Sequence, residues 1–536
     1  MPHDLARQAR EALGFELRPE QVEAAEAAAA GRDVVAVMPT GSGKSAIYQA
    51  AGLVRPGATV VVSPLIALQR DQLESIADAS LPAAAALNSS LKVSERRDAL
   101  ERLDADRLEF LFLAPEQLAN EETLARVRDA RPSLLVVDEA HCVSEWGHDF
   151  RPDYLRLGAF AEELGRPPVL ALTATASPPV REEIVLRLGL VDPLVVVHGF
   201  DRPNIHLSVE LHVADRARRA SLLAAVADAP KPGIVYAATR ARADETATAL
   251  AERGVAARAY HAGMSAAERE EVHAAFAADE LDAIVATTAF GMGVDKPNVR
   301  FVFHLDGSDS VDAYYQEVGR GGRDGEPAAA RLFFRPEDLN LRRFFGGTGN
   351  VDEAEVAEVV AALESRGDAA DPAALQEETG LSRAKLTTAL ARLEEADAVE
   401  ILPTGDVVAG DALAPGSAAD AAEAQEKRRS FERSRLEMLR GYAELRGCRR
   451  AYLLNYFGEA FDPPCGNCDN CEAGTLPDVP AARPFAVGAR VRHASWGEGA
   501  VQRYESDTMV VLFDEVGYRT LAVELVVRKE LLEAVP

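Results

Sequence analysis

A repeated alternation of short apolar runs with longer helical stretches constrains the fold of this chain most strongly. The first series of runs comprises DVVAV at 33–37, TVVV at 59–62, LEFLFL at 108–113, LLVV at 134–137 and VLAL at 169–172. After a polar break near 199–215, a second series comprises GIVY at 233–236, AIVA at 283–286, RFVF at 300–303 and RLFF at 331–334. Strands that are apolar on both faces belong to parallel sheets covered by helices on both sides. The sequence therefore predicts an α/β protein with two parallel-sheet domains, 1–205 and 206–345, and a cleft between them.

Residues 351–412 differ from this pattern. Three amphipathic helices are expected in 352–397, and TGLSRAKLTTAL has the short helix, glycine turn and second helix of a helix-turn-helix. AVEILPTGDVVAG then predicts a hairpin with Thr404 and Gly405 at its turn. These elements predict a winged helix whose candidate recognition helix carries the basic residues Arg383, Lys385 and Arg392. A helical spacer or a protein-contact module is the alternative, because the segment as a whole is acidic.

Two further parts follow, separated by Ala- and Pro-rich linkers at 411–420 and 474–484. Residues 420–474 contain four cysteines and a basic helical segment. Residues 484–536 alternate apolar and polar positions between glycine turns, which predicts a small five-stranded barrel. Its Trp496 is expected to pack in the barrel in preference to stacking on a base.

The overall charge argues against nucleic acid as a partner, but one segment reverses it. The net charge is −28, from 58 basic and 86 acidic residues, and phosphate neutralisation requires Lys and Arg. Residues 425–450, however, hold nine basic against four acidic residues. This segment is either a DNA-facing surface or a solvated helix face with compensating ion pairs.

The sequence shows no sign of a membrane or of secretion. MPHDLARQAREALGF reads as an amphipathic helix and not as a signal peptide, and no apolar run approaches the ~20 residues that a membrane span requires. We therefore expect a cytoplasmic, nucleoid-associated protein without membrane contacts, and a monomer.

MPTGSGKS at 38–45 lies between an expected strand and an expected helix, which is the context of a P-loop. Gly41 and Gly43 let backbone N–H groups face phosphates, Lys44 supplies charge, and Ser45 is a ligand for Mg²⁺. The strict pattern has Gly where this chain has Met38, so a chance glycine-rich turn is the alternative. We expect the nucleotide-binding set to be Thr40, Gly41, Ser42, Gly43, Lys44 and Ser45.

Asp138 and Glu139 follow a later apolar strand of the same domain. Because parallel strands end at one edge of their sheet, both carboxyl groups should lie beside the P-loop. Asp138 would hold Mg²⁺ through water, and Glu139 would orient or deprotonate the attacking water. An isolated Asp-Glu pair would more simply be a solvated strand end.

YYQEVGRGGRDG at 314–325 offers positive charge for the developing transition state. Gln316, Arg320 and Arg323 have the spacing i, i+4, i+7, which predicts one helical face. Arginines from one domain that reach a nucleotide on the other would make hydrolysis depend on cleft closure. Surface ion pairs with Asp324 or Glu317 are the alternative.

The stretch DEAHCVSEWGHDFRPDY at 138–154 joins the carboxylate pair to an aromatic loop. His141 would contact the facing domain. The loop residues Trp146, His148, Phe150 and Arg151 offer stacking and charge to single-stranded DNA, where one base–aromatic stack contributes about 1–3 kcal/mol. Packing of Trp146 in the core is the alternative.

Four of the five cysteines form a metal-binding pattern. Cys465, Cys468 and Cys471 make two overlapping C-x₂-C steps, and sixteen residues separate Cys448 from the first of them. Such spacing predicts a tetrahedral structural Zn²⁺, and disulfides, the alternative, are disfavoured inside cells. Cys142 is expected to be a small buried residue behind the DEAH sequence.

Several segments in order resemble RecQ-family DNA helicases of the second helicase superfamily. They are LGFELRPEQ (13–21), MPTGSGKS, SPLIALQRDQ (63–72), DEAHCVSEWGHDFRPDY, LTATA (172–176), GFDRPNI (199–205), YHAGM (260–264), TTAFGMGVDKPNVRFVFH (287–304), QEVGRGGRDG and GCRRAYLLNYFGEAFDPPCGNCDNC. The aromatic loop and the TTAFGMGVDKPNVR segment carry the most specific part of this resemblance. It implies two RecA-like domains, with ATP and Mg²⁺ as cofactors beside the zinc.

The resemblance also implies residue roles. Gln21, Arg18 and Phe15 match the residues that recognise adenine, and Thr173 and Thr175 match a segment that communicates between the two domains. Gln316, Arg320 and Arg323 match the motif that contacts the γ-phosphate. Where the family usually has Ala in this motif, the chain has Gly321.

The order of the C-terminal parts departs from the family. The expected winged helix precedes the zinc module, and the tail resembles the Tudor/SH3-like domain of UvrD/PcrA-type helicases, which binds partners such as RNA polymerase. The sequence thus predicts an ATP-dependent 3′→5′ DNA helicase that acts on single-stranded and partial-duplex DNA in repair or recombination. The alternatives are a DNA-stimulated translocase that does not unwind, a DNA-bound adaptor for transcription or repair factors, and a motor on RNA.

Overall fold

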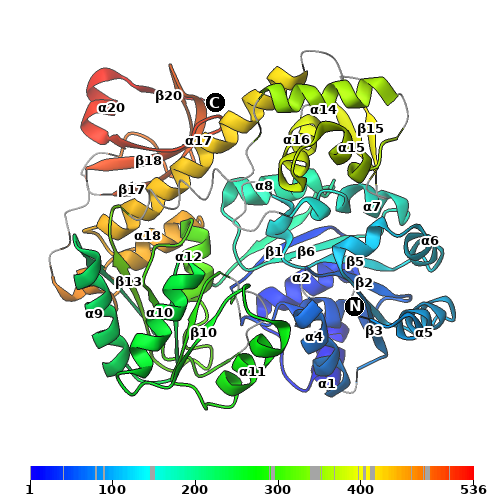
Figure 1. Ribbon diagram of the computed structural model, residues 1–536, viewed down its shortest axis with the longest axis horizontal. Helices are drawn as coiled ribbons and strands as arrows, with labels where there is room; N and C mark the ends of the chain where they lie inside the picture. The colour runs from blue at the N-terminus through cyan, green and yellow to red at the C-terminus, as the bar shows by residue number, and fades with distance from the viewer. Residues whose placement is uncertain are drawn as a thin grey trace. The chain divides into compact units, whose positions relative to one another are not determined.

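The computed structural model describes residues 2–39, 41–64, 66–78, 81–88, 91–144, 151–288, 290, 296–337, 351, 353–366, 369–395, 398–402, 406–410, 417–459, 461–474, 476, 483–505 and 507–535 (Figure 1). The chain divides into two compact units. The first comprises residues 1–38, 42–198 and 347–428, and the second comprises residues 39–41, 199–346 and 429–536.

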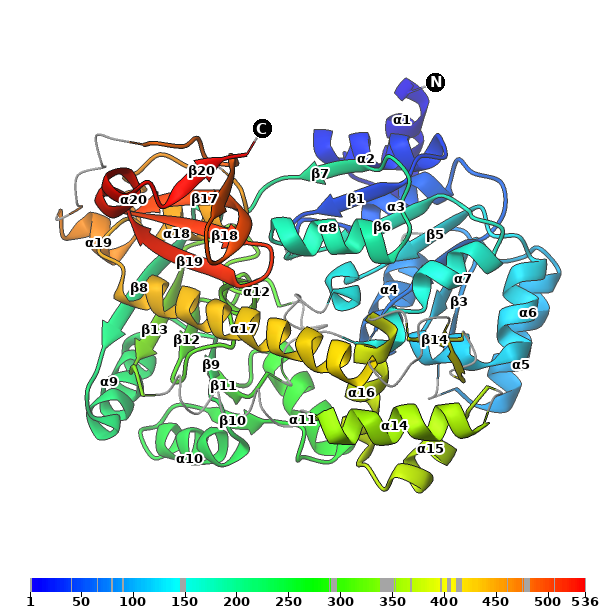
Figure 2. The ribbon, with the colours of Figure 1, turned by 90° about the horizontal axis from the view of Figure 1, so that it is seen from above.

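The first unit is built on a seven-stranded sheet in the order β3-β4-β2-β5-β6-β1-β7, and its strands pair in parallel (Figure 2). The strands are β1 (Val34–Val37), β2 (Thr59–Val62), β3 (Ala84–Leu87), β4 (Phe110–Leu113), β5 (Leu134–Val137), β6 (Val169–Thr173) and β7 (Leu194–Val197). The helices are α1 (Pro2–Leu13), α2 (Pro19–Ala29), α3 (Ser45–Gly52), α4 (Ile66–Asp78), α5 (Val93–Asp104), α6 (Glu121–Asp129), α7 (Leu157–Glu163) and α8 (Pro178–Arg187), with short 3₁₀ turns η1 (Pro115–Ala119), η2 (Ala140–Val143) and η3 (Pro152–Tyr154). The five inner strands are buried along their whole length, as their apolar composition requires.

The second unit contains a six-stranded parallel sheet in the order β10-β11-β9-β12-β13-β8. Its strands are β8 (Ile205–Leu211), β9 (Gly233–Tyr236), β10 (Ala257–Tyr260), β11 (Ala283–Ala286), β12 (Phe301–His304) and β13 (Ala328–Phe334). Its helices are α9 (Asp215–Asp228), α10 (Arg240–Ala251), α11 (Ala266–Ala277) and α12 (Val311–Val318). The two sheets confirm the predicted α/β class with two parallel-sheet domains.

The region expected to form a winged helix has three helices and a hairpin. They are α14 (Glu353–Arg366), α15 (Pro372–Thr379), α16 (Arg383–Glu395) and the antiparallel pair β14 (Val399–Ile401) and β15 (Val407–Ala409). Thr404 and Gly405 lie outside the described residues. On α16, Arg392 is only 2% exposed and Lys385 pairs with Glu355 on α14. The predicted basic recognition surface is therefore reduced to Arg383, because Arg392 is buried and Lys385, which is partly exposed, is already paired.

Two helices carry the basic segment, where one DNA-facing helix was expected. They are α17 (Ser417–Glu444) and α18 (Arg449–Tyr456), and a short helix α19 (Asp469–Glu472) follows. Arg435, Arg449 and Arg450 are 7%, 4% and 5% exposed. These three arginines are therefore not part of a DNA-facing surface, because each pairs with a carboxylate of the second unit: Arg435 with Asp312, Arg449 with Asp469 and Arg450 with Asp201.

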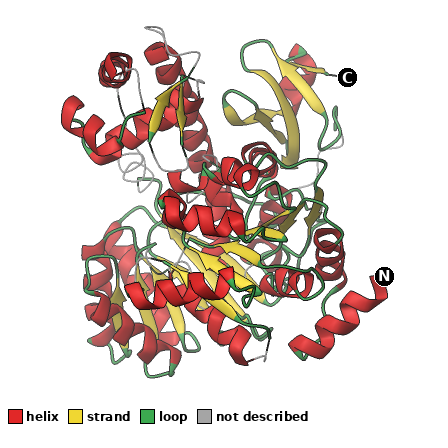
Figure 3. Cartoon of the chain, turned by 90° about the vertical axis from the view of Figure 1, so that its right-hand side faces the viewer, coloured by secondary structure: helices red, strands yellow, loops and turns green. Residues whose placement is uncertain are grey.

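The C-terminal part is a five-stranded antiparallel sheet in the order β19-β18-β17-β16-β20 (Figure 3). It comprises β16 (Arg490–His493), β17 (Gly497–Glu505), β18 (Thr508–Phe513), β19 (Gly517–Ala522), α20 (Val523–Lys529) and β20 (Leu532–Ala534). Trp496 is half-buried against Phe513 and stacks on His493 at 4.1 Å between ring centroids. The packing role expected for Trp496 is confirmed. Among the residues that the structure describes, no helix is long and apolar enough to cross a membrane.

Candidate nucleotide and metal sites

The P-loop connects β1 to α3. Gly41 and Gly43 have φ angles of 80° and 78°, a left-handed conformation that glycine adopts readily and that turns backbone N–H groups outward. Met38 is 1% exposed in the core below the sheet edge, and its N–H donates to Thr173 O at 3.0 Å. Met38, which stands where the strict P-loop pattern has Gly, is therefore a core residue directly after β1. Thr40 lies outside the described residues.

Asp138 ends β5 as a half-buried carboxylate. Its Oδ1 accepts from the N–H of Glu139 at 3.0 Å, and its Oδ2 accepts from Ser63 Oγ at 3.4 Å. Burial and the neighbouring Glu139 raise the pKa of Asp138 to about 7, although the charge of Lys44 opposes them. A carboxylate short of positive charge beside a P-loop lysine fits a site for a divalent cation, which favours the ionised form.

Glu139 occupies the left-handed region with φ 49° and ψ 46°, which costs a residue other than glycine about 1–3 kcal/mol and is often found at functional sites. Its Oε2 lies 3.3 Å from Nδ1 of His141. This turn directs the chain away from the sheet directly after the carboxylate pair.

The contact expected between His141 and the facing domain stays a prediction. The side chain of His141 is fully buried, and Nδ1 lies 2.8 Å from Thr173 Oγ1 at the end of β6. Thr173 Oγ1 in turn donates to the carbonyl of Thr175 at 3.1 Å. The histidine therefore links the acidic turn to the LTATA segment within one domain.

A hydrogen-bonded support beneath Asp138 was not predicted, although Ser63 and Gln69 lie in the SPLIALQRDQ segment and Tyr154 ends the DEAHCVSEWGHDFRPDY segment. The hydroxyl of Tyr154 donates to the carbonyl of Asp138 at 3.0 Å from a fully buried ring. Gln69 donates to Ser63 O at 3.0 Å and accepts from Asn88 at 2.9 Å. These contacts fix the backbone and the hydroxyl that hold the carboxylate.

Gln21 on α2 is tied to the P-loop. Its amide nitrogen donates to the carbonyls of Ser42 and Gly43 at 2.8 and 3.0 Å, and its Oε1 accepts from the N–H of Arg18 at 2.7 Å. Phe15 is 51% exposed and the side chain of Arg18 is also exposed. Gln21 therefore connects the start of α2 to the phosphate-binding loop.

The aromatic loop is described only at its end. Trp146, His148 and Phe150 lie outside the described residues. Arg151 is half-buried, its N–H donates to Cys142 O at 3.0 Å, and its guanidinium donates to Pro64 O at 3.0 Å. Cys142 is fully buried, as expected. Arg151 thus anchors the loop to the segment after β2, a contact that the sequence did not predict.

In the second unit, Gln316, Arg320 and Arg323 do not share one helical face. Helix α12 ends at Val318, and the two arginines follow in a turn. Arg320 is 3% exposed, and the positive charges of Arg320 and Arg323 lie near the buried Tyr236 hydroxyl. The i, i+4, i+7 spacing was misleading because α12 ends before the glycines at 319, 321 and 322.

Two residues of the GFDRPNI segment hold this turn. The guanidinium of Arg202 donates to the carbonyls of Gly319, Gly321 and Gly322 at 2.8, 2.7 and 3.0 Å. The amide of Asn204 donates to Gly322 O and Glu326 O, both at 2.8 Å. The resemblance pointed to this segment, but only the structure shows what its polar side chains do.

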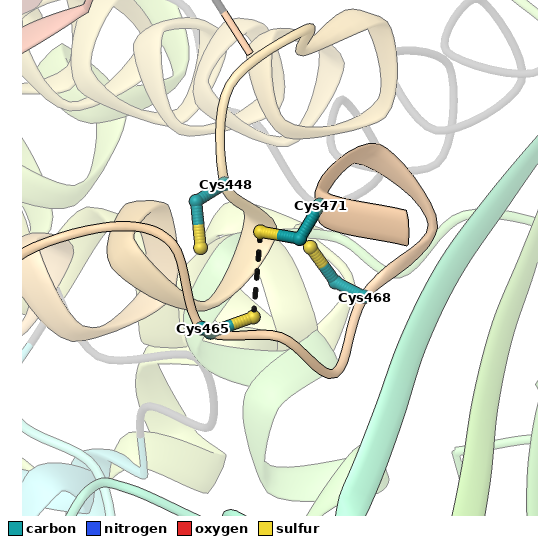
Figure 4. A group of neighbouring side chains, drawn as sticks. All are labelled: Cys448, Cys465, Cys468 and Cys471. Atoms are coloured by element: carbon teal, nitrogen blue, oxygen red, sulfur yellow. Dashed lines mark hydrogen bonds between the residues drawn. The ribbon is translucent and has the colours of Figure 1, made fainter. Parts of the chain in front are cut away.

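The four cysteines converge (Figure 4). Their Sγ atoms lie within 4.8 Å of one another, and Cys465 and Cys471 are 3.8 Å apart. Tetrahedral Zn–S bonds of about 2.3 Å place sulfur atoms about 3.8 Å apart, so the cluster has the dimensions of a metal site. A hydrogen bond from Cys448 holds the pKa of the Cys468 thiol well below its usual range, which favours the thiolate that a metal requires.

The cysteine loop also covers the edge strand β8. Residues Leu207 and Cys468 form a bridge, and the N–H of Val209 donates to the Asp469 carboxylate at 2.9 Å. Asn467 donates to Pro203 O at 2.8 Å. The metal-site loop therefore satisfies backbone groups that an open sheet edge would expose.

Three family models match the chain. They describe a DEAD/DEAH box helicase over residues 18–184, a helicase conserved C-terminal domain over 217–325, and a RecQ zinc-binding region over 405–472. Two solved structures support the fold alone: the DUF1998 helicase MrfA bound to DNA (TM-score 0.52, 18% identity, 77% of this chain and 60% of that one) and Mycobacterium smegmatis Lhr bound to single-stranded DNA and AMP-PNP (TM-score 0.50, 21% identity, 91% and 68%).

Curated relatives cover most of the chain. The probable ATP-dependent DNA helicase RecS of Bacillus subtilis is 35% identical over 461 residues, which are 84% of this chain and 88% of the relative. The ATP-dependent DNA helicase RecQ of Pasteurella multocida is 34% identical over 454 residues, but this chain spans only 60% of its length. Rat ATP-dependent DNA helicase Q5 is 35% identical over 94% of this chain and 47% of the relative. With these similarities added to its two parallel-sheet domains and its cysteine cluster, the chain belongs to the RecQ family of ATP-dependent DNA helicases.

Proposed function

We propose that the protein is an ATP- and Mg²⁺-dependent motor that moves 3′→5′ on DNA and unwinds it. The observation that carries the proposal is the arrangement of Lys44, Asp138 and Glu139 at one edge of the first sheet, supported from below by Ser63 and Tyr154. Glu139 orients the attacking water, and Arg320 and Arg323 supply positive charge to the γ-phosphate. Mg²⁺, held by Asp138 and Ser45, neutralises phosphate charge when bound.

The remaining site roles belong to the same proposal. Phe15, Arg18 and Gln21 bind adenine, Thr40, Gly41, Ser42 and Gly43 bind phosphates, and Gln316 assists the arginines. Trp146, His148, Phe150 and Arg151 signal bound single-stranded DNA to the acidic turn, and His141 and Thr173 pass that signal to β6. Zn²⁺ occupies the four-cysteine site. The C-terminal sheet binds a protein partner such as RNA polymerase or a repair factor, and the parts 1–205, 206–345, 351–412, 420–474 and 484–536 act as domains.

ATP hydrolysis measured with and without single-stranded DNA, followed by strand release from a 3′-tailed duplex, tests the proposal. We expect stimulation by DNA, release from the 3′-tailed duplex and little release from a 5′-tailed one. Lys44→Ala should abolish hydrolysis and retain DNA binding, and turnover by this variant would refute the site. A preference for RNA over DNA in the same assay would change the substrate class.

A translocase that does not separate strands is the second candidate. It is favoured by the winged-helix region, where Arg392 is buried and Lys385 is paired, so that little positive charge is left on α16 to hold a duplex. DNA-stimulated hydrolysis without strand release from either tailed duplex would establish this candidate in place of the helicase.

A further inference from the structure

Helix α12 leads directly into the turn that carries Arg320 and Arg323, and residues of α17 and α18 enclose it. Tyr314 packs against Tyr442 of α17 with ring centroids 5.0 Å apart, and Tyr315 packs against Phe457, the residue after α18, at 4.8 Å. Both tyrosines of α12 are buried. The helix therefore takes its position from the segment that also carries the cysteine cluster.

The N-terminal turn of α12 is held by a buried polar group. Asp312 is 2% exposed, and its Oδ2 accepts from the hydroxyl of Tyr456 at 2.5 Å and from the Arg435 guanidinium at 3.3 Å. The same nitrogen of Arg435 donates at 2.8 Å to Ser310 Oγ. Ser310 caps α12 by accepting from the N–H of Ala313 at 3.1 Å. A buried carboxylate is stable only with such partners.

The residues that bind Asp312 also lie against the C-terminal sheet. Tyr456 stacks on Tyr518 of β19 with centroids 5.6 Å apart, and Phe431 of α17 packs against the same ring at 6.0 Å. Gly517, at the start of β19, has a φ of 71°, and a Cβ there would lie 2.4 Å from Ser434 Oγ. The turn between β18 and β19 thus packs closely against Ser434 of α17, the residue that precedes Arg435.

We infer that Asp312 is a positioning residue for ATP hydrolysis, through which α17, α18 and the C-terminal sheet set the placement of Arg320 and Arg323. Only Gly319 separates the end of α12 from Arg320, so a shift of the helix is transmitted to the arginines. A misplacement of about 1 Å in a catalytic group can cost 10²-fold in rate. The inference rests on the proposed function, because it explains what places Arg320 and Arg323, the two arginines that the proposed function assigns to the γ-phosphate.

Tyr456→Phe tests the inference with a minimal change, because it keeps the ring and removes only the donor to Asp312. We expect the kcat of DNA-stimulated ATP hydrolysis to fall about tenfold or more, as for the loss of one buried hydrogen bond to a charged group. The KM for ATP and the zinc content should stay at wild-type values. The matched control is Tyr452→Phe, whose hydroxyl lies on the same helix but donates to Met438 O. A wild-type kcat for Tyr456→Phe, or an equal loss in both variants, would overturn the inference.

Gly517→Ala tests the link to the C-terminal sheet. We expect the same selective fall in kcat, because the added Cβ meets Ser434. Gly497→Ala is its control, since Gly497 also has a positive φ (74°) in the same sheet but open space around it. Equal kcat values for these two variants would overturn the role of the sheet.

Hydrogen exchange of the full-length protein separates this inference from the proposed function. The amides of 311–322 should exchange faster in Tyr456→Phe than in Tyr452→Phe, whether or not the protein hydrolyses ATP. Unchanged exchange would refute the positioning by Asp312, whereas an altered exchange in a protein without DNA-stimulated turnover would refute the function alone.

Discussion

At the scale of single residues, the glycines before Arg323 make different demands on the backbone. Gly322 has a φ of 55°, and a Cβ there would lie 2.4 Å from Asn204 Nδ2 and 2.6 Å from Glu326 O. Gly321 has no such φ, and its nearest contact would be Ala328 Cβ at 3.3 Å. We expect Gly321→Ala to change the free energy of unfolding by no more than about 1 kcal/mol, with a gain from reduced chain entropy, and Gly322→Ala to lower it by more than that. Denaturant midpoints check this, and equal losses would show that our account of the two sites is wrong.

Glu109, at the start of β4, predicts a pH dependence of stability. Burial, with help from Asp106, raises the pKa of this carboxyl from 4.5 to about 7. The unfolded chain therefore releases the proton at a lower pH than the folded protein, so the contribution of Glu109 is full below about pH 4.5 and is lost as the pH rises towards 7. At pH 8, the free energy of unfolding of Glu109→Gln should exceed that of wild type by on the order of 1–2 kcal/mol. At pH 5 the two proteins should unfold at nearly the same denaturant concentration. Parallel stability curves across this range would contradict the prediction.

At the scale of elements, the turn after α12 depends on a segment that is far away in sequence. The guanidinium of Arg202 donates to three backbone carbonyls of this turn. A lysine ammonium lacks the planar arrangement of donors that reaches all three at once. Arg202→Lys should lower the free energy of unfolding by about 2 kcal/mol, since two hydrogen bonds contribute about 1 kcal/mol each, and should also lower kcat. The control is Arg219→Lys, at an exposed ion pair with Glu245 in the same unit, where we expect a change within about 0.5 kcal/mol. Similar midpoints for both variants would exclude the anchoring role.

At the scale of the whole molecule, the cysteine cluster joins parts that are distant in sequence, because its loop pairs with β8 and its helices hold α12. Removal of the metal with a strong chelator should therefore do more than loosen residues 448–474. We expect faster hydrogen exchange in β8 and α12, a lower melting temperature and loss of ATPase activity, with exchange in β1 to β6 unchanged. Re-addition of Zn²⁺ should restore all three. Protection of β8 that survives metal removal would show that the loop holds its fold without the ion.

The distribution of charge belongs to the same scale. The chain is acidic overall, and some arginines of the basic segment 425–450 are buried and paired inside the second unit. Arg449 binds Asp469 and the carbonyl of Tyr442, and Arg450 binds Ile205 O. We expect DNA affinity to depend on salt less steeply than nine free cations in 425–450 would make it, because Arg435, Arg449 and Arg450 are buried and paired. Affinity measured between 50 and 200 mM salt checks this, and a fall approaching 10⁵-fold would contradict it.

The sequence by itself determined the features that depend on neighbours along the chain. Apolar runs of four to six residues specified nine of the thirteen strands of the two parallel sheets, but not β3, β7, β8 and β10. MPTGSGKS specified a phosphate loop between strand and helix, and the C-x₂-C steps specified a cysteine cluster. Each of these follows from local periodicity, from glycine conformation or from ligand spacing, so no knowledge of the packing was needed.

Only the tertiary structure decided where individual polar side chains point. Within its own domain, His141 is buried against Thr173, 32 residues away, a contact that the sequence did not predict. Arg320 was expected on a helix and follows it in a turn held by Arg202, which lies more than a hundred residues earlier. Asp312 gave no signal at all, because a carboxylate on a helix is usually solvated, and its role arises from Tyr456 and Arg435. The free-energy cost of an unpaired buried charge fixes such contacts, and which groups become buried together depends on how distant elements pack.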